Sequence, residues 1–571
     1  MFERSPDIQK SMQARPLIAM IGDQYSTYQK PIVASMHRLL KRSGYGLLYA
    51  CGGALRPTAD WDSSRPVSRN AIYTLARDFP VAGFVVLSSA VGNHADATQL
   101  AEFAQRFTHK PIVCLGSSVA NLSCVSMDNY ALVTQLMNHM TQDPSRRRFV
   151  FIRGYANSPN SQSREAAFRN ALNKHQIAID ESLFIDGSFQ GVDAYYAMDK
   201  LLKRTHDIHA VVAANDVMAQ SAIHALTKHG LRIPEDVIVS GFDNRSETAS
   251  SGPSLTSVKY SMDSFCGLAV ESLLTQIKSG IFLSADNTTV CPPAQLVIRG
   301  STEPALLPTR RHVPTPRVFE AMEFRESLLR SLKNLETPDG LDPEIVVSDV
   351  VSMLVNGADY SGTRLHTALL ELHNRPAHIY WWRHLLQQLT TNLQLHGSEG
   401  LSADALAHTA SILGQIQTTI WNVENAIKLE NERHFESVNR MQSSLNRVNN
   451  MGELLTVLKS TPSQSTVNAW FICLYKQSGN QPDEMARLLY QYPPNSSLDT
   501  DTLFPSADVL PGDYLQYNIV GSLILEPLCA GSSHLGYIVV DAKKEQHYTR
   551  SNLTAIADII ANVLWRLLNE H

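Results

Sequence analysis

The chain has 571 residues, which predicts three or four domains at about 150 residues each. Hydrophobic residues make up 44% and charged residues 18%, a balance that excludes wholesale disorder, collagen-like repeats and a small disulfide-bonded scaffold. The formal net charge is −5, so no overall positive field draws the chain to nucleic acid or anionic lipid.

The seven cysteines form no C-x-x-C pair, so they predict neither a disulfide framework nor a zinc finger. The N-terminal residues lack the apolar core of a secretory signal. No run approaches the roughly 18 apolar residues of a membrane helix. We therefore expect a soluble cytoplasmic protein that has no cofactor and no membrane partner.

From residue 16 to about 303, short apolar runs alternate with amphipathic stretches. The runs are apolar at successive positions, which is typical of parallel strands buried on both faces. The pattern predicts an α/β fold with a doubly wound sheet, and the length favours two lobes with a cleft between them. The expected strands are Leu17–Ile21, Gly46–Ala50, Gly83–Leu87, Ile112–Leu115, Phe149–Ile152, Ala210–Ala213 and Val237–Ser240.

Polar and aromatic residues follow several of these runs, at the strand ends where such folds bind ligands. Carboxylate, amide and guanidinium groups beside aromatic rings suit a small polyhydroxylated molecule. The candidates are Asp23, Tyr25, Tyr28, Ser88, Asp128, Arg164, Asn215 and Asp243. Local roles compete with ligand binding. Asp128 and Asn215 also fit helix N-caps, Arg164 a surface ion pair, and Tyr25, Tyr28 and Ser88 ordinary loop or packing positions.

Several motifs in this half occur in a characteristic order. They are Val125–Asn129, Ser163–Phe168, Ala213–Ala219, Gly230–Val237, Gly241–Asp243 and Pro253–Val258. Their order and spacing resemble the lactose/galactose-repressor family over about half of the chain. The resemblance implies a periplasmic-binding-protein fold that closes on a sugar, a nucleobase or a similar molecule.

The same resemblance assigns site residues. The family's ligand-contacting Arg, Asn and Asp fall on Arg164, Asn215 and Asp243, and its acidic contact before a helix falls on Asp128. Tyr260 stands where the family often has Gln, which implies a more aromatic pocket. Only about 16 residues precede the first strand, too few for the family's helix-turn-helix and hinge. We therefore expect a sensor domain, at residues 1–303, without the DNA-binding headpiece.

Residues 304–316 are rich in Pro and polar residues and are predicted to be a linker. Residues 317–414 show helical spacing and are predicted to be a helical domain whose function the sequence does not disclose. Trp381 and Trp382 lie among leucines there, which favours a core position over a stacking platform.

Residues 415–450 carry an apolar seam that includes Val438, Met441 and Leu445. Spacings of three and four predict a long signalling helix that pairs as a coiled coil in a homodimer. The other interpretation is a helix packed on its own chain.

Residues 451–571 combine helix, strand and helix patterns. The runs Leu523–Leu528 and Leu535–Val540 resemble the paired central strands of GAF domains, which are sensory modules of bacterial signalling proteins. The expected order is an amphipathic helix from Met451, strands at Trp470–Tyr475, Ser522–Leu525 and Leu535–Asp541, and a final helix at Ser551–Leu568.

The common phosphate-loop, serine-hydrolase and zincin motifs do not occur in the sequence. The leading hypothesis is therefore a non-enzymatic sensor that binds a small polar metabolite and signals through a dimeric helix and a GAF-like module, with a separate output partner. One alternative is a transcriptional regulator with an unrecognised DNA-binding surface, although the charge argues against DNA binding. Another is the sensory half of a diguanylate cyclase whose catalytic domain lies beyond residue 571.

Overall fold

The computed structural model describes most of the chain. The described residues are 15–26, 28–56, 67–245, 248, 252–281, 288–290, 295–303, 321–332, 342–356, 379, 381–383, 385–386, 388–389, 403–460, 467–493, 503–511, 521–542 and 553–569. The predicted linker at 304–316 lies outside them. Within the described part, no helix is both long and apolar enough to cross a membrane.

The first lobe is built on a parallel sheet that contains the four strands predicted for it and two, at 124–126 and 288–290, that were not predicted. Its strands are β1 (Leu17–Gly22), β2 (Gly46–Cys51), β3 (Gly83–Val86), β4 (Ile112–Gly116), β5 (Cys124–Ser126) and β11 (Thr288–Val290). One sheet face packs against α2 (Gln29–Arg42) and α11 (Met262–Ser279). The other packs against α3 (Ile72–Arg77) and α5 (Ala97–Gln105). Helices on both faces are what bury such continuous apolar runs.

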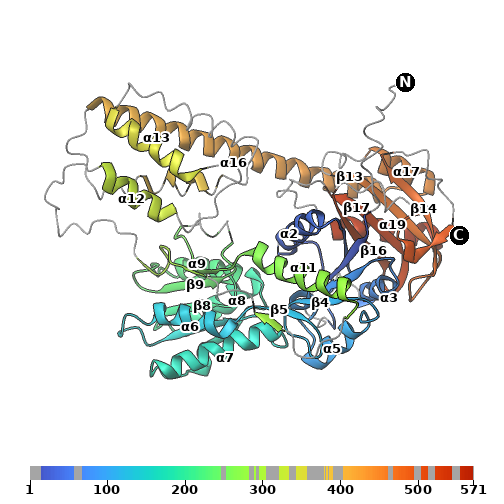
Figure 1. Cartoon of the computed structure of the whole chain (residues 1–571), viewed down its shortest axis with the longest axis horizontal. Helices are drawn as coiled ribbons and strands as arrows, with labels where there is room; N and C mark the ends of the chain where they lie inside the picture. Colours follow the sequence, from blue (N-terminus) through green and yellow to red (C-terminus); the bar gives the residue numbers. More distant parts are fainter. Residues whose placement is uncertain are drawn as a thin grey trace.

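The second lobe has its own sheet in the order β12-β10-β9-β8-β6-β7. The strands are β6 (Phe149–Arg153), β7 (Phe184–Asp186), β8 (Ala210–Ala213), β9 (Ile238–Phe242), β10 (Thr256–Lys259) and β12 (Gln295–Val297), and the main helices are α6 (Asn129–Met140), α7 (Pro159–Lys174), α8 (Gly191–Leu202) and α9 (Asp216–Lys228). The chain passes between the two sheets after β5, after β10 and between β11 and β12. The predicted two-lobed α/β fold is confirmed (Figure 1).

The C-terminal region forms an antiparallel sheet with helices on one face. It contains α17 (Met451–Ser460), β13 (Val467–Gly479), β14 (Met485–Tyr492), β15 (Leu503–Pro505), β16 (Ser522–Ala530), β17 (Ser533–Ala542) and α19 (Leu553–Asn569). The predicted helices and strands occur in the predicted order, and β14 and β15 are two further strands that were not predicted.

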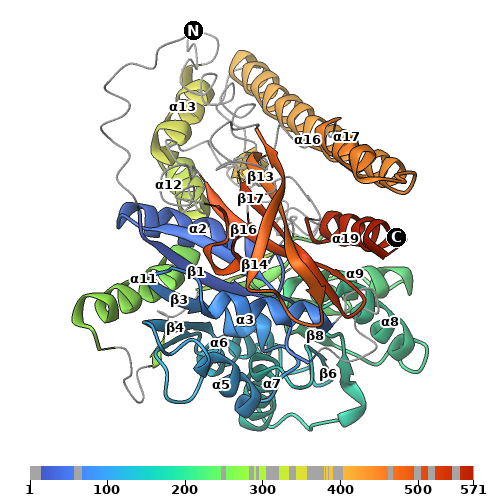
Figure 2. The same ribbon diagram turned by 90° about the vertical axis from the view of Figure 1, so that its right-hand side faces the viewer.

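This C-terminal sheet is continuous with the sheet of the first lobe, which the sequence did not predict. β16 pairs in parallel with β2, with Leu523 opposite Leu48 and Leu525 opposite Ala50. The result is a single eleven-stranded sheet in the order β11-β5-β4-β3-β1-β2-β16-β17-β13-β14-β15 (Figure 2). The C-terminal module therefore lies directly against the first lobe.

The helical region is built from α12 (Ala321–Leu332), α13 (Pro343–Asn356) and the first half of α16 (Ala403–Leu445). Its core contains Trp381 and Trp382, both buried as predicted, together with Ile416 and Ile420 of α16. Helix α16 runs from this region to the C-terminal module, and it begins earlier than the predicted residue 415 (Figure 1).

At the C-terminal end of α16, residues of the predicted dimer seam pack against their own chain. Met441 and Leu445 are buried in one apolar cluster with residues of α17 and α19 of the same chain. At these two positions the interpretation of a helix packed on its own chain is the one the structure supports. The side chain of Val438 lies outside the described residues. Pairing with a second copy stays a prediction.

Candidate functional site

Arg164 and Asp243 both lie beside Phe242, the last residue of β9. Arg164, on α7, is buried; its Nε donates to Asn129 Oδ1 at 3.0 Å and its guanidinium donates to the Ala214 carbonyl. The guanidinium also lies 4.4 Å from the centroid of the Phe242 ring. This side chain is therefore rigidly placed rather than paired with a surface carboxylate.

Asp243 follows β9 with φ of 98°, a backbone conformation that costs energy for a residue with a side chain. Burial raises the pKa of its carboxyl group, while the charges of Arg164 and Arg245 lower it. Among the described residues, none donates a hydrogen bond to this half-buried carboxylate. A strained, partly desolvated carboxylate beside a fixed cation is suited to accept hydrogen bonds from a bound molecule.

Tyr28 of the first lobe and Tyr260, where the chain crosses between the lobes after β10, both lie near Asp243. Burial raises the pKa of Tyr28 to about 12, and the next largest influence is the charge of Asp243. Burial also raises the pKa of Tyr260 well above its usual value, with Tyr28 and Asp243 as the next contributors. The Tyr28 hydroxyl lies 3.5 Å from Ser89 Oγ. Tyr28 and Tyr260 therefore lie near Asp243 and Arg164, where the two lobes meet, and we refer to this place as the expected cleft.

Asp23 and Tyr25 lie at the first-lobe side of this cleft. Asp23 is buried and accepts a hydrogen bond from Gln29 Nε2 at 2.7 Å and one from the Gln24 backbone at 2.9 Å. The Tyr25 ring lies 6.1 Å from that of Tyr49, and burial raises its pKa to about 12. Hydrogen bonds between Asp23 and its neighbours therefore hold the loop after β1 in place. The Tyr25 ring in this loop is half-buried.

Three predicted site residues have local structural roles. The Ser88 hydroxyl lies 2.7 Å from the Ser117 carbonyl and accepts from the Ser117 backbone at 2.9 Å. Asp128 and Asn215 cap α6 and α9, accepting from backbone N–H groups three residues on at 2.9 Å each. Asn215 also donates from Nδ2 to the Phe189 carbonyl at 3.1 Å. Their contact with a ligand stays a prediction.

An aromatic cluster at the cleft was missed by sequence reasoning. The ring of His94, from the first lobe, lies 4.2 Å from that of Tyr155, from the second. Tyr155 in turn lies 5.8 Å from Phe189 and accepts from Gln190 Nε2 at 3.1 Å. Tyr155 comes two residues after β6, so the strand-end rule that found the other candidates applies to it as well.

Asp216, the first residue of α9, is a buried carboxylate that supports the loop carrying Asp243. It accepts from Ser257 Oγ at 2.6 Å and from the Arg245 backbone at 2.7 Å. Burial raises its pKa to about 7, and the nearby charge of Asp243 adds to the shift. The turn after β9 is thereby tied to α9.

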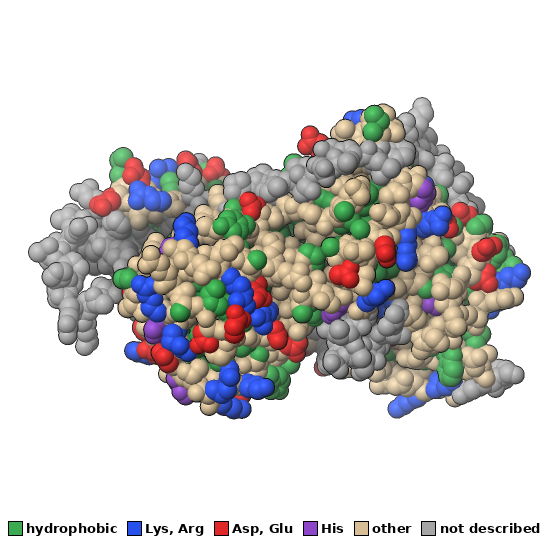
Figure 3. Space-filling view, turned by 90° about the horizontal axis from the view of Figure 1, so that it is seen from below, with side chains coloured by type: hydrophobic (Ala, Val, Ile, Leu, Met, Phe, Trp, Pro, Cys, Tyr) green, Lys and Arg blue, Asp and Glu red, His purple; other side chains and the backbone are tan. Residues whose placement is uncertain are grey.

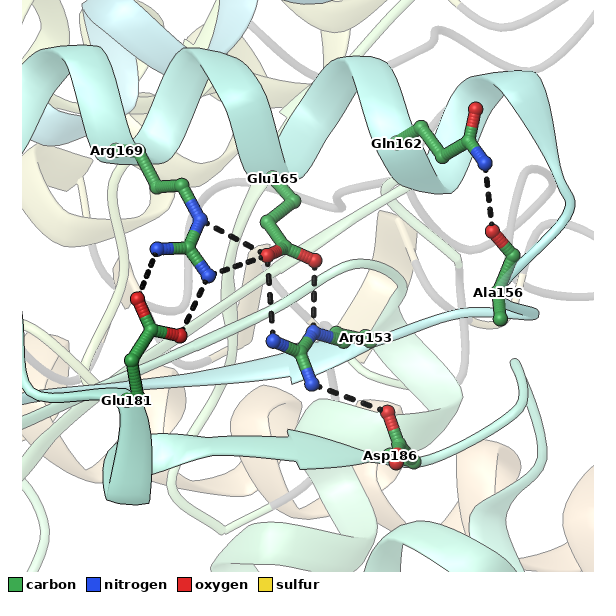
Figure 4. Close-up of polar contacts among 7 residues, drawn as sticks. All are labelled: Arg153, Ala156, Gln162, Glu165, Arg169, Glu181 and Asp186. Atoms are coloured by element: carbon green, nitrogen blue, oxygen red, sulfur yellow. Dashed lines mark hydrogen bonds and ion pairs between the residues drawn. The ribbon is translucent and has the colours of Figure 1, made fainter.

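An ion network on the outer side of the second lobe fixes α7, which carries Arg164 (Figure 4). Glu165 accepts from Arg153 Nε at 2.7 Å and from Arg169 at 2.9 and 2.7 Å. Arg169 also pairs with Glu181 at 2.6 Å, and Arg153 with Asp186 at 3.4 Å. Because Glu165 follows Arg164 directly on the helix, these bonds help to set the direction in which Arg164 points.

The described residues contain no group of three or more His, Cys, Asp or Glu side chains placed to hold a metal ion. What the cleft does contain is a carboxylate, a fixed guanidinium and several half-buried rings. This set can bind a small polar molecule by hydrogen bonds and ring contacts.

Comparisons with known proteins match part of this chain to a domain family and to several regulators. The periplasmic binding protein-like domain family matches residues 143–302. The HTH-type transcriptional regulator MalR of Clostridium butyricum is 35% identical over 134 residues, covering 24% of this chain and 39% of that protein. The HTH-type transcriptional repressor PurR of Klebsiella pneumoniae is 25% identical over 254 residues, covering 44% of this chain and 70% of that protein.

Among solved structures, the CelR–cellobiose complex is similar at 22% identity with a TM-score of 0.43, covering 52% of this chain and 92% of that chain. The Escherichia coli repressor AscG is similar at 22% identity with a TM-score of 0.41, covering 50% and 98%. The match spans well under half of MalR's length. This chain thus contains a periplasmic-binding-protein-like domain whose relatives include transcriptional regulators.

Proposed function

We propose that this chain is a ligand-sensing regulatory protein. It binds a small polar molecule, sugar-like or nucleoside-like, between its two lobes and passes the change to its C-terminal module. The relatives named MalR and PurR are regulators of transcription, which supports a regulatory role for this sensor as well.

The observation that carries this proposal is the state of Asp243. Its carboxylate is half-buried, lies near Arg164 and has no hydrogen-bond donor among the described residues. A half-buried carboxylate beside a fixed cation can accept a hydrogen bond from a ligand hydroxyl or N–H. Tyr28 and Tyr260, from other elements, lie near the same carboxylate, whose charge adds to the rise in the pKa of each.

A thermal-shift panel of monosaccharides, disaccharides, nucleobases and nucleosides tests the proposal. A binder at 100 times its dissociation constant adds about 2.7 kcal/mol to the free energy of unfolding. We expect the Asp243→Asn variant to lose this shift while its unliganded melting temperature stays close to that of the unaltered protein. Asp193→Asn, an exposed carboxylate on α8, is the matched control and keeps the shift. A binder that stabilises Asp243→Asn equally would show that the site lies elsewhere.

A second candidate function is that of a DNA-binding transcriptional repressor, because the named relatives are HTH-type proteins. Against it, the net charge is −5, and basic and acidic side chains lie interspersed on the face seen in Figure 3. Selection from random duplex DNA at physiological salt separates the two. Recovery of a palindromic site would establish the repressor function, and we expect no such site. A homodimer and a separate output partner also remain predictions.

A further inference from the structure

The contact between the first lobe and the C-terminal module contains a buried ion cluster. Arg69 lies in the short helix η1 (Val67–Ala71), which follows β2 in the chain, and is 2% exposed. Its guanidinium donates to Glu526 of β16, which is fully buried, and to Asp558 Oδ1 of α19 at 2.9 Å. Thr554 Oγ1 of α19 donates to the other oxygen of Glu526 at 2.9 Å. The cluster thus joins one first-lobe segment to two C-terminal elements.

The same segment is also tied to the strand ends that form the cleft. Asn70 Nδ2 donates to the Gly52 carbonyl at 2.7 Å, just after β2. Tyr73, in α3 directly after η1, donates from its hydroxyl towards the carbonyls of Gly22 at 2.9 Å and Gly53 at 2.6 Å. Gly22 directly precedes Asp23, so η1 and α3 hold the base of the cleft loop.

A second connection runs through β2 itself. Tyr49 is the β2 residue opposite Ile524 of β16, and its hydroxyl donates to the Gln24 carbonyl at 2.8 Å. A methyl group at Gly22 would lie 2.0 Å from this hydroxyl, so the loop and the Tyr49 ring have no free space between them. Movement of residues 22–25 therefore has to displace the side chains of Tyr49 on β2 and Tyr73 on α3, which follows η1 directly.

We propose that η1, held by Arg69, couples the cleft to the C-terminal module. This inference rests on the proposed function for its biological meaning, but the coupling itself exists without a ligand. Coupling between two sites is reciprocal, so loosening the Arg69 cluster must loosen the cleft loop as well. The shared sheet, rather than the linker and α16 alone, then carries the signal.

Hydrogen exchange of the full chain without ligand tests the coupling. In Arg69→Met we expect residues 553–569 of α19 and the cleft segment 17–26 both to exchange faster by about tenfold or more, because the carboxylates lose their buried cation. Strand β8 of the second lobe keeps its exchange rate. Arg77→Met, an exposed arginine on neighbouring α3, is the control and leaves all three segments unchanged.

Asp558→Asn is the milder second variant, because it removes one charge at the partly exposed edge of the cluster. Faster exchange in α19 with an unchanged cleft segment would overturn the proposal, since the cluster would then be only a local clamp. Equal acceleration of β8 in both variants would also overturn it, because the effect would then be global. Ligand loss in Asp243→Asn bears on the site and not on this coupling, so the two tests fail separately.

Discussion

The two lobes share one fold but differ in how their sheets end. The sheet of the first lobe continues across β2 into the C-terminal module, and its two apolar clusters contain residues of both. The sheet of the second lobe ends at β12 and β7, and its cluster contains second-lobe residues and the crossover residues Met127 and Tyr260. The first lobe and the C-terminal module are therefore one packed body.

The two sides of the expected cleft therefore belong to bodies of different size. Tyr28 lies on the large combined body, whereas Arg164 and Asp243 lie on the smaller second lobe. If binding closes the cleft, the second lobe is the part that moves as a rigid body against the other. The comparison can be sharpened by removing equivalent charges or contacts from each side.

The largest effect is expected for Glu526→Gln in the combined body. This carboxylate is fully buried against Arg69, and removing one partner of a buried pair costs about 3–5 kcal/mol. Urea unfolding of the two proteins measures the loss. Arg69→Met combined with Glu526→Met leaves neither of these two charges and should recover part of it. No recovery in the double variant would argue against a charge effect.

Asp216→Asn tests the corresponding buried carboxylate of the second lobe. The pKa of Asp216 is raised to about 7, above the unfolded value, so folding takes up a proton between about pH 4 and 7. The stabilisation is complete below the unfolded pKa and is lost as the pH rises through 7, by at most about 4 kcal/mol. Melting temperatures from pH 4.5 to 7.5 should show this slope in the unaltered protein and not in the Asn variant.

Leu445→Ala separates packing within the chain from pairing between chains. Leu445 is fully buried against α17 and α19, so truncation should cost about 3 kcal/mol from the lost contacts and the cavity. We expect light scattering to give the same oligomeric state for Leu445→Ala and for the unaltered protein. Conversion of a dimer to a monomer, with unchanged stability, would restore the seam as a pairing surface.

The sequence was sufficient for features that are locally encoded. Each predicted parallel strand is a short apolar run, whereas strands with few apolar residues, such as β10 and β11, were not predicted. Arg164 and Asp243 stand in motifs that the sequence alone shows. The pairing of β2 with β16 joins residues that are far apart in the chain, so no periodicity reveals it. One signal was present in the sequence: Leu523–Ala530 is apolar at every position except Glu526, and the structure buries the whole strand. A strand buried on both faces belongs inside a sheet, and its carboxylate requires a buried cation.

Glu165→Gln is the second-lobe counterpart of Glu526→Gln and should have the smallest effect. Burial acts to raise the pKa of Glu165, but hydrogen bonds from Arg153 and Arg169 outweigh it and hold the pKa below its usual value. Its stabilisation is therefore present at neutral pH and is lost as the pH falls through the folded pKa. The network is partly exposed, so we expect a loss of about 1 kcal/mol at pH 7 in urea unfolding. A loss as large as that of Glu526→Gln would mean that the lobes are stabilised alike, and the contrast between them would fail.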